Sequence, residues 1–262
     1  MKITTWNING VKARLEHAVA YLSAESPDVV CLQEIKSVDE GFPRGAFEDL
    51  GYNVETFGQK GFNGVAILSK APLDDVKRGL PGDDLDVQSR WIEAIVPLGR
   101  RVVRVASIYL PNGNPIGTEK FSYKLAWMAR LEAHVRRLLE DEIPLVLAGD
   151  FNVIAEPADA KRPQAWVNDA LFQPESRRAF RTLLNLGLTD AVRAAYPGPG
   201  IFTFWDYQAD AFQKDDGIRI DHILLSPEAA DLMNSVGIDR AVRASEKPSD
   251  HVPVWVDLDA EN

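Results

Sequence analysis

The feature that most constrains the fold is a series of short apolar runs, each bounded by Gly, Pro, Asn or Asp. Runs of this kind are typical of β-strands. They predict strands at Ile3–Trp6, Val29–Gln33, Val65–Leu68, Trp91–Val96, Val102–Tyr109, Leu145–Ala148, Ile220–Leu225 and Val252–Leu258. Several runs follow one another with no helical segment between them, which favours sheets packed on each other over a purely doubly wound parallel sheet.

Helical periodicity is found in three stretches, Val11–Ser23, Glu119–Glu140 and Ser176–Leu186. The 262 residues are 45% hydrophobic and 26% charged, which is enough apolar material for a sizeable core. No linker, repeat or low-complexity tract divides the chain. We therefore expect an α/β protein whose residues 1–262 form a single domain.

Charge and cysteine content restrict the class of protein further. The net charge of −10 argues against a protein that coats nucleic acid through bulk positive charge, although local phosphate contacts stay possible. The single cysteine, Cys31, excludes a disulfide scaffold and is expected to be a small core residue in a reducing compartment. No apolar run is long enough to span a membrane and no export signal is found at the N-terminus, so a cytoplasmic protein is expected.

Polar side chains that bind metals or phosphate stand at the ends of five predicted strands. Each one alone is more typical of a turn or a helix cap, but the joint pattern is harder to explain in that way. Carboxylate and amide oxygens suit Mg²⁺ or Mn²⁺, whereas one Cys and four His make a zinc site a poor match. The residues are Asn7, Asn9, Glu34, Asp150, Asn152, Asp221, Asp250 and His251.

Seven segments carry a resemblance to a known family: WNINGVKAR, CLQEIK, YLPNG, GDFN, FTFWDY, RIDHILLS and KPSDHVPV. In order and in approximate spacing they are similar to the exonuclease III family of abasic-site endonucleases, from Lys2 to about Leu258. GDFN or SDH alone is shared across the wider endonuclease/exonuclease/phosphatase superfamily. The resemblance implies a four-layer α/β sandwich, with two mixed β-sheets packed face to face and helices outside.

The resemblance also implies a metal site. Glu34 corresponds to the principal ligand, with Asn9 and Asp250 close enough to help directly or through water. The implied ion is Mg²⁺, with Mn²⁺ as a possible substitute, and Mg²⁺ commonly takes only one or two carboxylates.

Catalytic roles follow from the same resemblance. His251 corresponds to a histidine that contacts the scissile phosphate, with Asp221 hydrogen-bonded to its other ring nitrogen; a neutral general base is the competing role for His251. Asp150 corresponds to the residue that orients or deprotonates the attacking water. Asn7 and Asn152 would hold Asp150 and the phosphate.

Further residues match positions that contact DNA in the family. Tyr109 and Asn112 correspond to phosphate-contacting residues, and Phe204 and Trp205 to aromatics that line a pocket for a base-less sugar. An aromatic pair in a strand is ordinarily core, so this assignment depends on the family context. Ile218 departs from the pattern, because some relatives have an aromatic residue there.

DNA affinity has to come from local positive charge, which makes binding salt-dependent. Basic residues in or beside candidate rim segments are Lys12, Arg14, Lys60, Lys120, Lys124, Lys214 and Arg219, and Arg219 is also a candidate substrate contact. The expected partner is double-stranded DNA with abasic sites or blocked 3′ ends, bound by a monomer. The expected reaction is hydrolysis 5′ to an abasic site to leave a 3′-hydroxyl, with 3′–5′ exonuclease and 3′-end cleaning at the same site.

Two alternatives stay open from the sequence. A phosphoesterase of the same superfamily that acts on a non-DNA substrate would keep the acidic residues and His251 but would not need the YLPNG and FTFWDY aromatics. A non-catalytic binding protein with this fold would be marked by loss of Glu34, Asp150 or His251, and all three are present.

Overall fold

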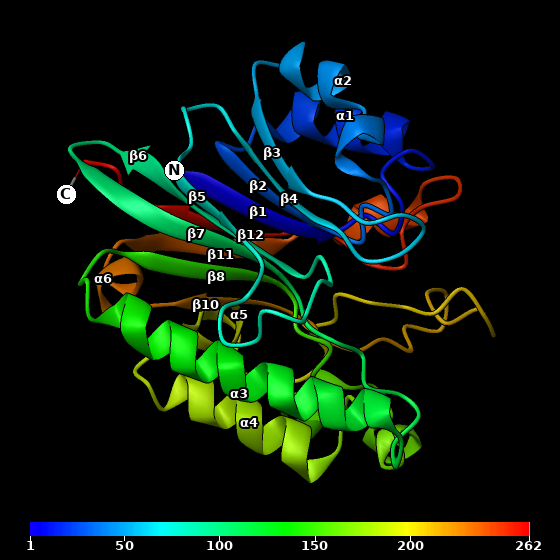
Figure 1. The fold of residues 1–262 in the computed structure, drawn as a ribbon. Coiled ribbons are helices and arrows are strands. Elements are labelled where there is room, and N and C mark those ends of the chain that lie inside the picture. The colour runs from blue at the N-terminus through cyan, green and yellow to red at the C-terminus, as the bar shows by residue number, and fades with distance from the viewer. Residues whose placement is uncertain (262) are drawn as a thin grey trace.

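The computed structural model describes residues 1–261, which form two stacked six-stranded sheets (Figure 1). Sheet A has the spatial order β11-β12-β1-β2-β4-β3. Only the central pair β1–β2 is parallel among its hydrogen-bonded neighbours. Its strands are β1 (Lys2–Asn7), β2 (Val29–Gln33), β3 (Asn53–Phe57), β4 (Val65–Ser69), β11 (Met233–Ile238) and β12 (Val254–Leu258).

Sheet B is built on the same plan, in the order β5-β6-β7-β8-β10-β9. Here the parallel pair is β7–β8, again near the centre, and its other neighbours are antiparallel. Its strands are β5 (Asp74–Arg78), β6 (Trp91–Leu98), β7 (Arg101–Tyr109), β8 (Leu145–Asp150), β9 (Thr189–Asp190) and β10 (Asp221–Leu225).

Each parallel pair is joined by a helix, because parallel strands need a crossover connection. α1 (Leu15–Glu25) joins β1 to β2, and α3 (Glu119–Leu139) joins β7 to β8. Figure 1 shows α1 and α2 over the outer face of sheet A, and α3 and α4 over the outer face of sheet B. No described helix has the length and apolar content needed to cross a membrane. The remaining helices are α2 (Arg44–Glu48), α4 (Pro174–Leu184), α5 (Ala191–Ala195), α6 (Pro227–Ala230) and the 3₁₀ segments Asp39–Gly41, Pro157–Asp159, Pro163–Trp166 and Arg240–Ala244.

Three apolar layers hold the helices and sheets together. One lies between the two sheets and includes Ile3, Cys31 and Ile223. A second joins sheet B to α3 and α4, and a third joins sheet A to α1 and α2. Three apolar layers between four structural layers confirm the four-layer sandwich, and the burial of Cys31 confirms it as a core residue.

All eight predicted strands correspond to strands of the two sheets. The helix predicted from Val11 begins only at Leu15, so its predicted start is wrong. The physical reason is that the Gly10 and Val11 amides donate to the carbonyls of Glu34 and Ile35, which extends the contact between the two segments that follow β1 and β2. Sequence analysis missed β3, β5, β9 and β11.

Candidate active site

The candidate site lies where strands of both sheets end at one rim. In sheet A, Asn7 pairs with Gln33 at the ends of β1 and β2, so Glu34 follows directly. In sheet B, Asp150 ends β8 between Tyr109 of β7 and Asp221 of β10. Because the two sheets are stacked, the polar residues of both rims face one another.

Three residues at or just beyond the strand ends of this rim have a left-handed backbone. Asn9, Glu34 and Asn152 have φ values of 48°, 47° and 47°. This conformation is strained for residues other than glycine and is concentrated at functional sites. It bends the chain at the strand ends and brings the side chains toward the space between the sheets.

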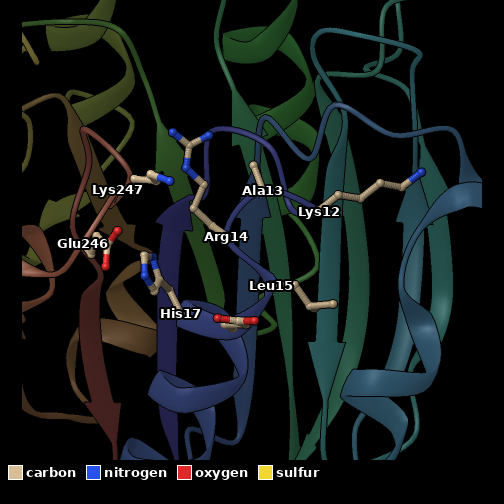
Figure 2. Close-up of a pocket in the computed structure, with 8 residues that line it drawn as sticks. Lys12, Ala13, Arg14, Leu15, His17, Glu246 and Lys247 are labelled. Atoms are coloured by element: carbon tan, nitrogen blue, oxygen red, sulfur yellow. The ribbon is translucent and has the colours of Figure 1, made fainter.

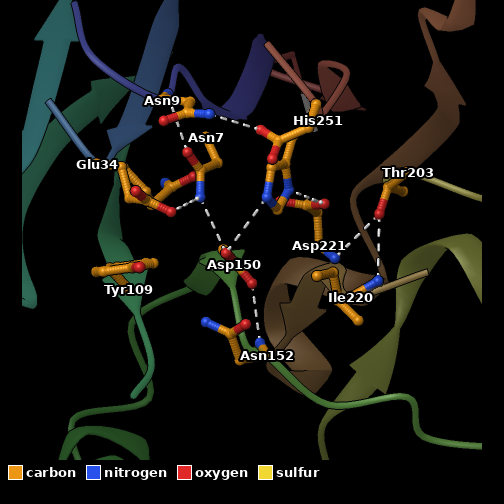
Figure 3. A network of polar contacts seen from close by, with 12 residues as sticks. Asn7, Asn9, Glu34, Tyr109, Asp150, Asn152, Thr203, Ile220, Asp221 and His251 are labelled. Atoms are coloured by element: carbon orange, nitrogen blue, oxygen red, sulfur yellow. Dashed lines mark hydrogen bonds and ion pairs between the residues drawn. The ribbon is translucent and has the colours of Figure 1, made fainter. Parts of the chain in front are cut away.

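His251 stands between two carboxylates. Its Nδ1 lies 2.9 Å from Asp221 Oδ2, and its Nε2 lies 3.7 Å from Asp150 Oδ2 (Figure 3). The Asp221 position is fixed by its own backbone amide, which donates to the Thr203 hydroxyl. An Nδ1–H that donates to Asp221 leaves Nε2 directed at the space beside Asp150.

The surroundings shift the pKa values of both groups. Burial alone would lower the pKa of His251, but the charges of Asp221 and Asp150 raise it to about 10. Burial raises the pKa of Asp150 to about 7, and the negative charges of Asp221 and Glu34 act in the same direction. His251 is therefore a cation at neutral pH, and Asp150 titrates close to neutrality.

Asn7 connects the two acidic residues on opposite sheets. Its side-chain amide donates to Glu34 Oε1 and to Asp150 Oδ2, each at 2.9 Å. Burial would raise the pKa of Glu34, but the Asn7 hydrogen bond and the charges of Lys36 and His251 lower it overall. Glu34 is thus held in its ionised form.

The donor set fits a hard divalent cation. One oxygen or nitrogen each from Glu34, Asp150 and His251 can be chosen within 4.8 Å of one another. The Lys36 ammonium contacts Glu34 Oε2 at 3.0 Å and Asn9 Oδ1 at 2.6 Å, so a positive group already lies on these two oxygens. The Asn9 amide also donates to Asp250. The site offers carboxylate and amide oxygens, the ligands that Mg²⁺ prefers.

A cavity of about 300 Å³ opens directly beside these groups. Its polar wall includes the acidic residues, His251, Tyr109, Asn112 and Asn152. Apolar side chains also line it: Trp166, Leu171, Phe204 and Ile220. The Phe204 ring packs on the His251 ring at 5.0 Å between centroids.

Sequence reasoning missed six residues of this cavity, namely Asn114, Trp166, Asp169, Leu171, Asp206 and Ile220. The Asn114 amide donates to Asp169 and its oxygen accepts from the Ala170 amide, which fastens the loop of residues 157–172 over the rim. The sequence signals were two polar, turn-rich segments: PNGNPIG, which contains Asn114, and EPADAKRPQA, which comes directly before Trp166. Such a composition is typical of loops that carry function.

Tyr109 and Asn112 lie at the cavity as expected. The Asn112 amide donates to Asn152 Oδ1 at 3.3 Å, and the guanidinium of Arg90 packs over the Tyr109 ring. Burial, together with the charges of Glu34 and Asp150, raises the pKa of Tyr109 well above its usual range. The Tyr109 hydroxyl therefore keeps its proton and can donate a hydrogen bond to a phosphate oxygen.

Three predicted DNA contacts lie elsewhere, and those predictions need correction. Trp205 is 1% exposed and its indole N–H donates to Asp215, so it packs in the interior while its neighbour Phe204 faces the cavity. Arg219 is 1% exposed and pairs with buried Asp159 and Asp190. Lys124 is completely buried beneath the rim loops. None of the three can reach a bound DNA without a rearrangement.

Ile218, at the position where some relatives have an aromatic residue, does not line the cavity. Ile218 is 1% exposed and packs with Ile154, Ala160 and Ile220. Of this segment, Ile220 and not Ile218 lines the cavity. The absence of an aromatic residue at position 218 therefore affects the packing next to Ile220 and not the cavity lining itself.

Comparison with known proteins agrees with this site. A model of the endonuclease/exonuclease/phosphatase family matches residues 4–251. Exodeoxyribonuclease III of Haemophilus influenzae is 36% identical over 266 residues, which cover 98% of this chain and 100% of that protein.

Solved structures show the same similarity. A 3′-5′ exonuclease from Neisseria meningitidis is 40% identical, with a TM-score of 0.94 and coverage of 99% of this chain and 100% of that one. A Neisseria 3′ phosphatase bound to a product DNA hairpin is 39% identical, with a TM-score of 0.94 and 99% coverage of both chains. An AP endonuclease from Archaeoglobus fulgidus is 36% identical, with a TM-score of 0.93 and 99% coverage of both.

The fold and the acidic site between its sheets thus define a phosphoesterase, and the chain belongs to the endonuclease/exonuclease/phosphatase family. Within that family it belongs to the exonuclease III branch of abasic-site endonucleases, which are DNA-repair nucleases.

Proposed function

We propose that this enzyme hydrolyses the DNA phosphodiester 5′ to an abasic site and leaves a 3′-hydroxyl. The same site would trim 3′ ends and remove 3′-blocking groups, since each reaction is attack of water on a phosphorus linked to a 3′-oxygen. The observation that carries the proposal is the cavity that His251, Asp150 and Glu34 line together with apolar side chains, among them Phe204.

Asp150 takes a proton from the attacking water, because its pKa of about 7 is suited to accepting a proton near neutral pH. The water oxygen bonds to phosphorus while the bond from phosphorus to the 3′-oxygen breaks, and the leaving 3′-oxygen takes a proton from solvent to become the 3′-hydroxyl. The His251 cation and the Tyr109 hydroxyl donate to the phosphate oxygens as their negative charge grows. The Asn152 side chain, held by its hydrogen bond to the Leu110 carbonyl, positions the same phosphate.

Glu34, with Asn9 and Asp250, would hold Mg²⁺, or Mn²⁺ as a substitute. When bound there, the ion supplies positive charge that offsets the charge of the phosphate and of the leaving oxygen.

The apolar wall explains selectivity for a sugar without a base. Phe204, Trp166 and Leu171 bound a cavity of about 300 Å³ next to the acidic residues. A nucleotide that has lost its base swings out of the duplex at lower cost than an intact one, and its sugar packs against an apolar surface.

A hollow beside the site would provide a path for the DNA backbone. It has a volume of about 440 Å³, and the cations Lys12, Arg14 and Lys247 in its lining outnumber the carboxylates of Glu16 and Glu246 (Figure 2). Arg14 contacts Tyr207, whose hydroxyl also accepts a hydrogen bond from Asn9 at the active-site rim. The overall charge of −10 therefore coexists with local positive charge where a strand would enter.

The proposal is tested on a duplex that contains one tetrahydrofuran abasic analogue, with Mg²⁺ and with EDTA, beside an undamaged duplex and one with a 3′-phosphate. We expect metal-dependent incision 5′ to the analogue, much faster than degradation of the undamaged strand. Trimming or 3′-phosphate release without incision would limit the function to 3′-end processing. Hydrolysis of small phosphodiesters alone would contradict the DNA assignment.

Phe204 and Trp205 form a matched pair of neighbouring aromatics for this assay. Phe204→Ala removes part of the cavity wall and is expected to lower the rate on the abasic duplex by about tenfold to a hundredfold. Trp205→Ala removes a buried ring and is expected to lower mainly the free energy of unfolding, by about 3–5 kcal/mol.

We further infer a monomer that acts in the cytoplasm, where its DNA substrate and a reducing environment for Cys31 coincide. Light scattering during size exclusion, with and without a DNA duplex, tests the first point, and fractionation of the source cells tests the second. A stable dimer in the absence of DNA would contradict the monomer.

A further inference from the structure

Lys124, in the second turn of α3, is completely buried directly below the active-site loops. Its ammonium donates to three backbone carbonyls, those of Asn152 at 2.6 Å, Asn112 at 3.1 Å and Ala170 at 3.5 Å. The three carbonyls belong to three different loops, which follow β7, β8 and the 3₁₀ segment at Pro163–Trp166. One side chain therefore ties together the three loops that surround the phosphate end of the cavity.

The loops also pack tightly on the lysine stem. Gly113 has a φ of +87°, and a Cβ at this position would come within 2.6 Å of Lys124 Cδ. Above the stem, the Asn112 amide donates to Asn152 Oδ1 at 3.3 Å, and both side chains line the cavity. Displacement of Lys124 would therefore change the spacing of the Asn112 and Asn152 amides.

Packing alone does not account for an ammonium group here. Within residues 1–261, no ion pair joins Lys124 to a carboxylate, and burial lowers the pKa of Lys124 to about 7 although the charges of Asp150 and Asp169 oppose the shift. An apolar side chain would avoid this cost of burial. A methionine would fill similar volume, but it would leave the carbonyls of Asn112 and Asn152 without this donor. The amino group of Lys124 thus satisfies backbone carbonyls of the active-site loops.

We propose that Lys124 is a positioning residue for the phosphate-binding amides: it fixes the spacing of Asn112 and Asn152 from beneath. The inference rests on the proposed function only for the identity of the phosphate ester. It predicts that Lys124 affects the reaction through these two asparagines and has no contact with the DNA.

The test is a double-mutant cycle between Lys124→Met and Asn152→Ala. Rates are measured on the abasic-analogue duplex and on bis-p-nitrophenyl phosphate, at a temperature where each variant is folded. A loss on the small diester would support the role of Lys124 even if the DNA assignment failed. We expect Lys124→Met to lower kcat by about tenfold to a hundredfold with little change in KM, because small displacements of positioning groups have effects of this size.

In the Asn152→Ala background, the further loss caused by Lys124→Met should fall to about threefold or less, because coupled residues are not additive. Arg104→Met is the matched control: Arg104 is also buried and charged, but it pairs with Glu93 and Asp75 near the opposite end of β7. It should lower the free energy of unfolding and leave kcat unchanged.

The proposal is overturned if folded Lys124→Met has the wild-type kcat, if its effect is undiminished in the Asn152→Ala background, or if Arg104→Met lowers kcat equally. Should Lys124→Met fail to fold, the cycle is run with Lys124→Arg. That variant keeps hydrogen-bond donors at this position but displaces them, so it should lower kcat by less than Lys124→Met does. In the Asn152→Ala background, the further loss of kcat caused by Lys124→Arg should again be smaller than in the wild type.

Discussion

Strand β10 begins with two neighbouring residues that belong to two different charged clusters. Asp221 pairs with His251 in the cavity cluster, which also contains Glu34 and Asp150. His222, one residue later, points to the opposite face, as alternation along a strand requires. It belongs to a closed cluster made up of His222, Arg219, Arg193, Asp159 and Asp190.

The two histidines are both buried but differ in their hydrogen-bond partners. Arg219 can only donate, so the His222 Nδ1 that it contacts at 3.1 Å is an acceptor, and Nε2–H donates to the Val153 carbonyl at 2.9 Å. Both ring nitrogens of His222 therefore have partners within the protein. In contrast, His251 donates from Nδ1 to Asp221 and keeps Nε2 beside Asp150 and the cavity.

Charge balance separates the clusters more clearly than burial does. In the closed cluster, the carboxylates of Asp159 and Asp190 are matched by Arg219 and Arg193. In the cavity cluster, negative groups outnumber positive ones, and this excess contributes to the raised pKa of Asp150. A histidine–carboxylate pair alone does not indicate chemistry; unmatched negative charge beside a cavity does.

The largest expected effect comes from removal of the group that accepts the proton. Asp150→Asn should lower the single-turnover rate on the abasic-analogue duplex by about a thousandfold, in the range of lost general-base catalysis. The free energy of unfolding should not fall, because the substitution removes a buried carboxylate that lies close to Asp221 and Glu34. Timed incision assays measure the single-turnover rate, and urea unfolding measures the free energy of unfolding. A variant that is destabilised but active would contradict the role of Asp150 as the proton acceptor.

Arg219→Met is the counterpart in the closed cluster. It leaves Asp159 and Asp190 buried without their main partner, so the free energy of unfolding should fall by about 3–5 kcal/mol. The rate per folded molecule should stay within about threefold of wild type, since Arg219 does not reach the cavity. Loss of rate at unchanged stability would instead restore Arg219 as a substrate contact.

Asp221→Asn should change the pH dependence of the reaction. Asp221 raises the pKa of His251, so the wild-type histidine stays protonated through neutral pH and loses its proton near pH 10. Without that carboxylate the proton is lost at lower pH, and the basic limb of kcat/KM should move toward neutrality, with about a tenfold loss for each pH unit beyond the new pKa. Asp190→Asn, the matched change beside His222, should leave the basic limb of kcat/KM at the wild-type pH. Equal shifts of this limb in Asp221→Asn and Asp190→Asn would contradict the difference between the two clusters.

The smallest effect concerns the acid stability of the closed cluster. Burial opposes ionisation of Asp190, but the charge of Arg219 and the hydrogen bond from the Arg193 backbone amide hold its pKa well below its usual range. A depressed carboxyl pKa stabilises the fold above the unfolded-state value near 4 and loses this contribution as the pH falls. The stability difference between wild type and Asp190→Asn should therefore shrink by about 1 kcal/mol between pH 6 and pH 3 in urea titrations. A difference that grows toward pH 3 would contradict the paired, ionised Asp190.

Much of the fold could be predicted because its central strands are continuous apolar runs. The missed strands lack this signal: β5, Asp74–Arg78, is mostly exposed and polar, and β9 has only two residues. Edge strands of this kind depend on their neighbours and not on their own hydrophobicity.

The site was predictable where residues end or directly follow a buried strand, as Asp150 ends β8 and Glu34 follows β2. Local sequence could not decide which aromatic of Phe204 and Trp205 faces the cavity, because alternation places one on each side without saying which. Nor could it place Trp166, whose loop is held at the rim by the tertiary contact between Asn114 and Asp169.

The most direct test of the division between the two clusters is the same substitution on each histidine, His251→Gln and His222→Gln, assayed side by side. Single-turnover incision of the abasic-analogue duplex and urea unfolding are measured on both. We predict that His251→Gln loses about a hundredfold or more in rate with its unfolding midpoint retained, whereas His222→Gln keeps its rate and loses about 1–3 kcal/mol of stability. A folded His222→Gln that is as inactive as His251→Gln, or a fully active His251→Gln, would contradict the account.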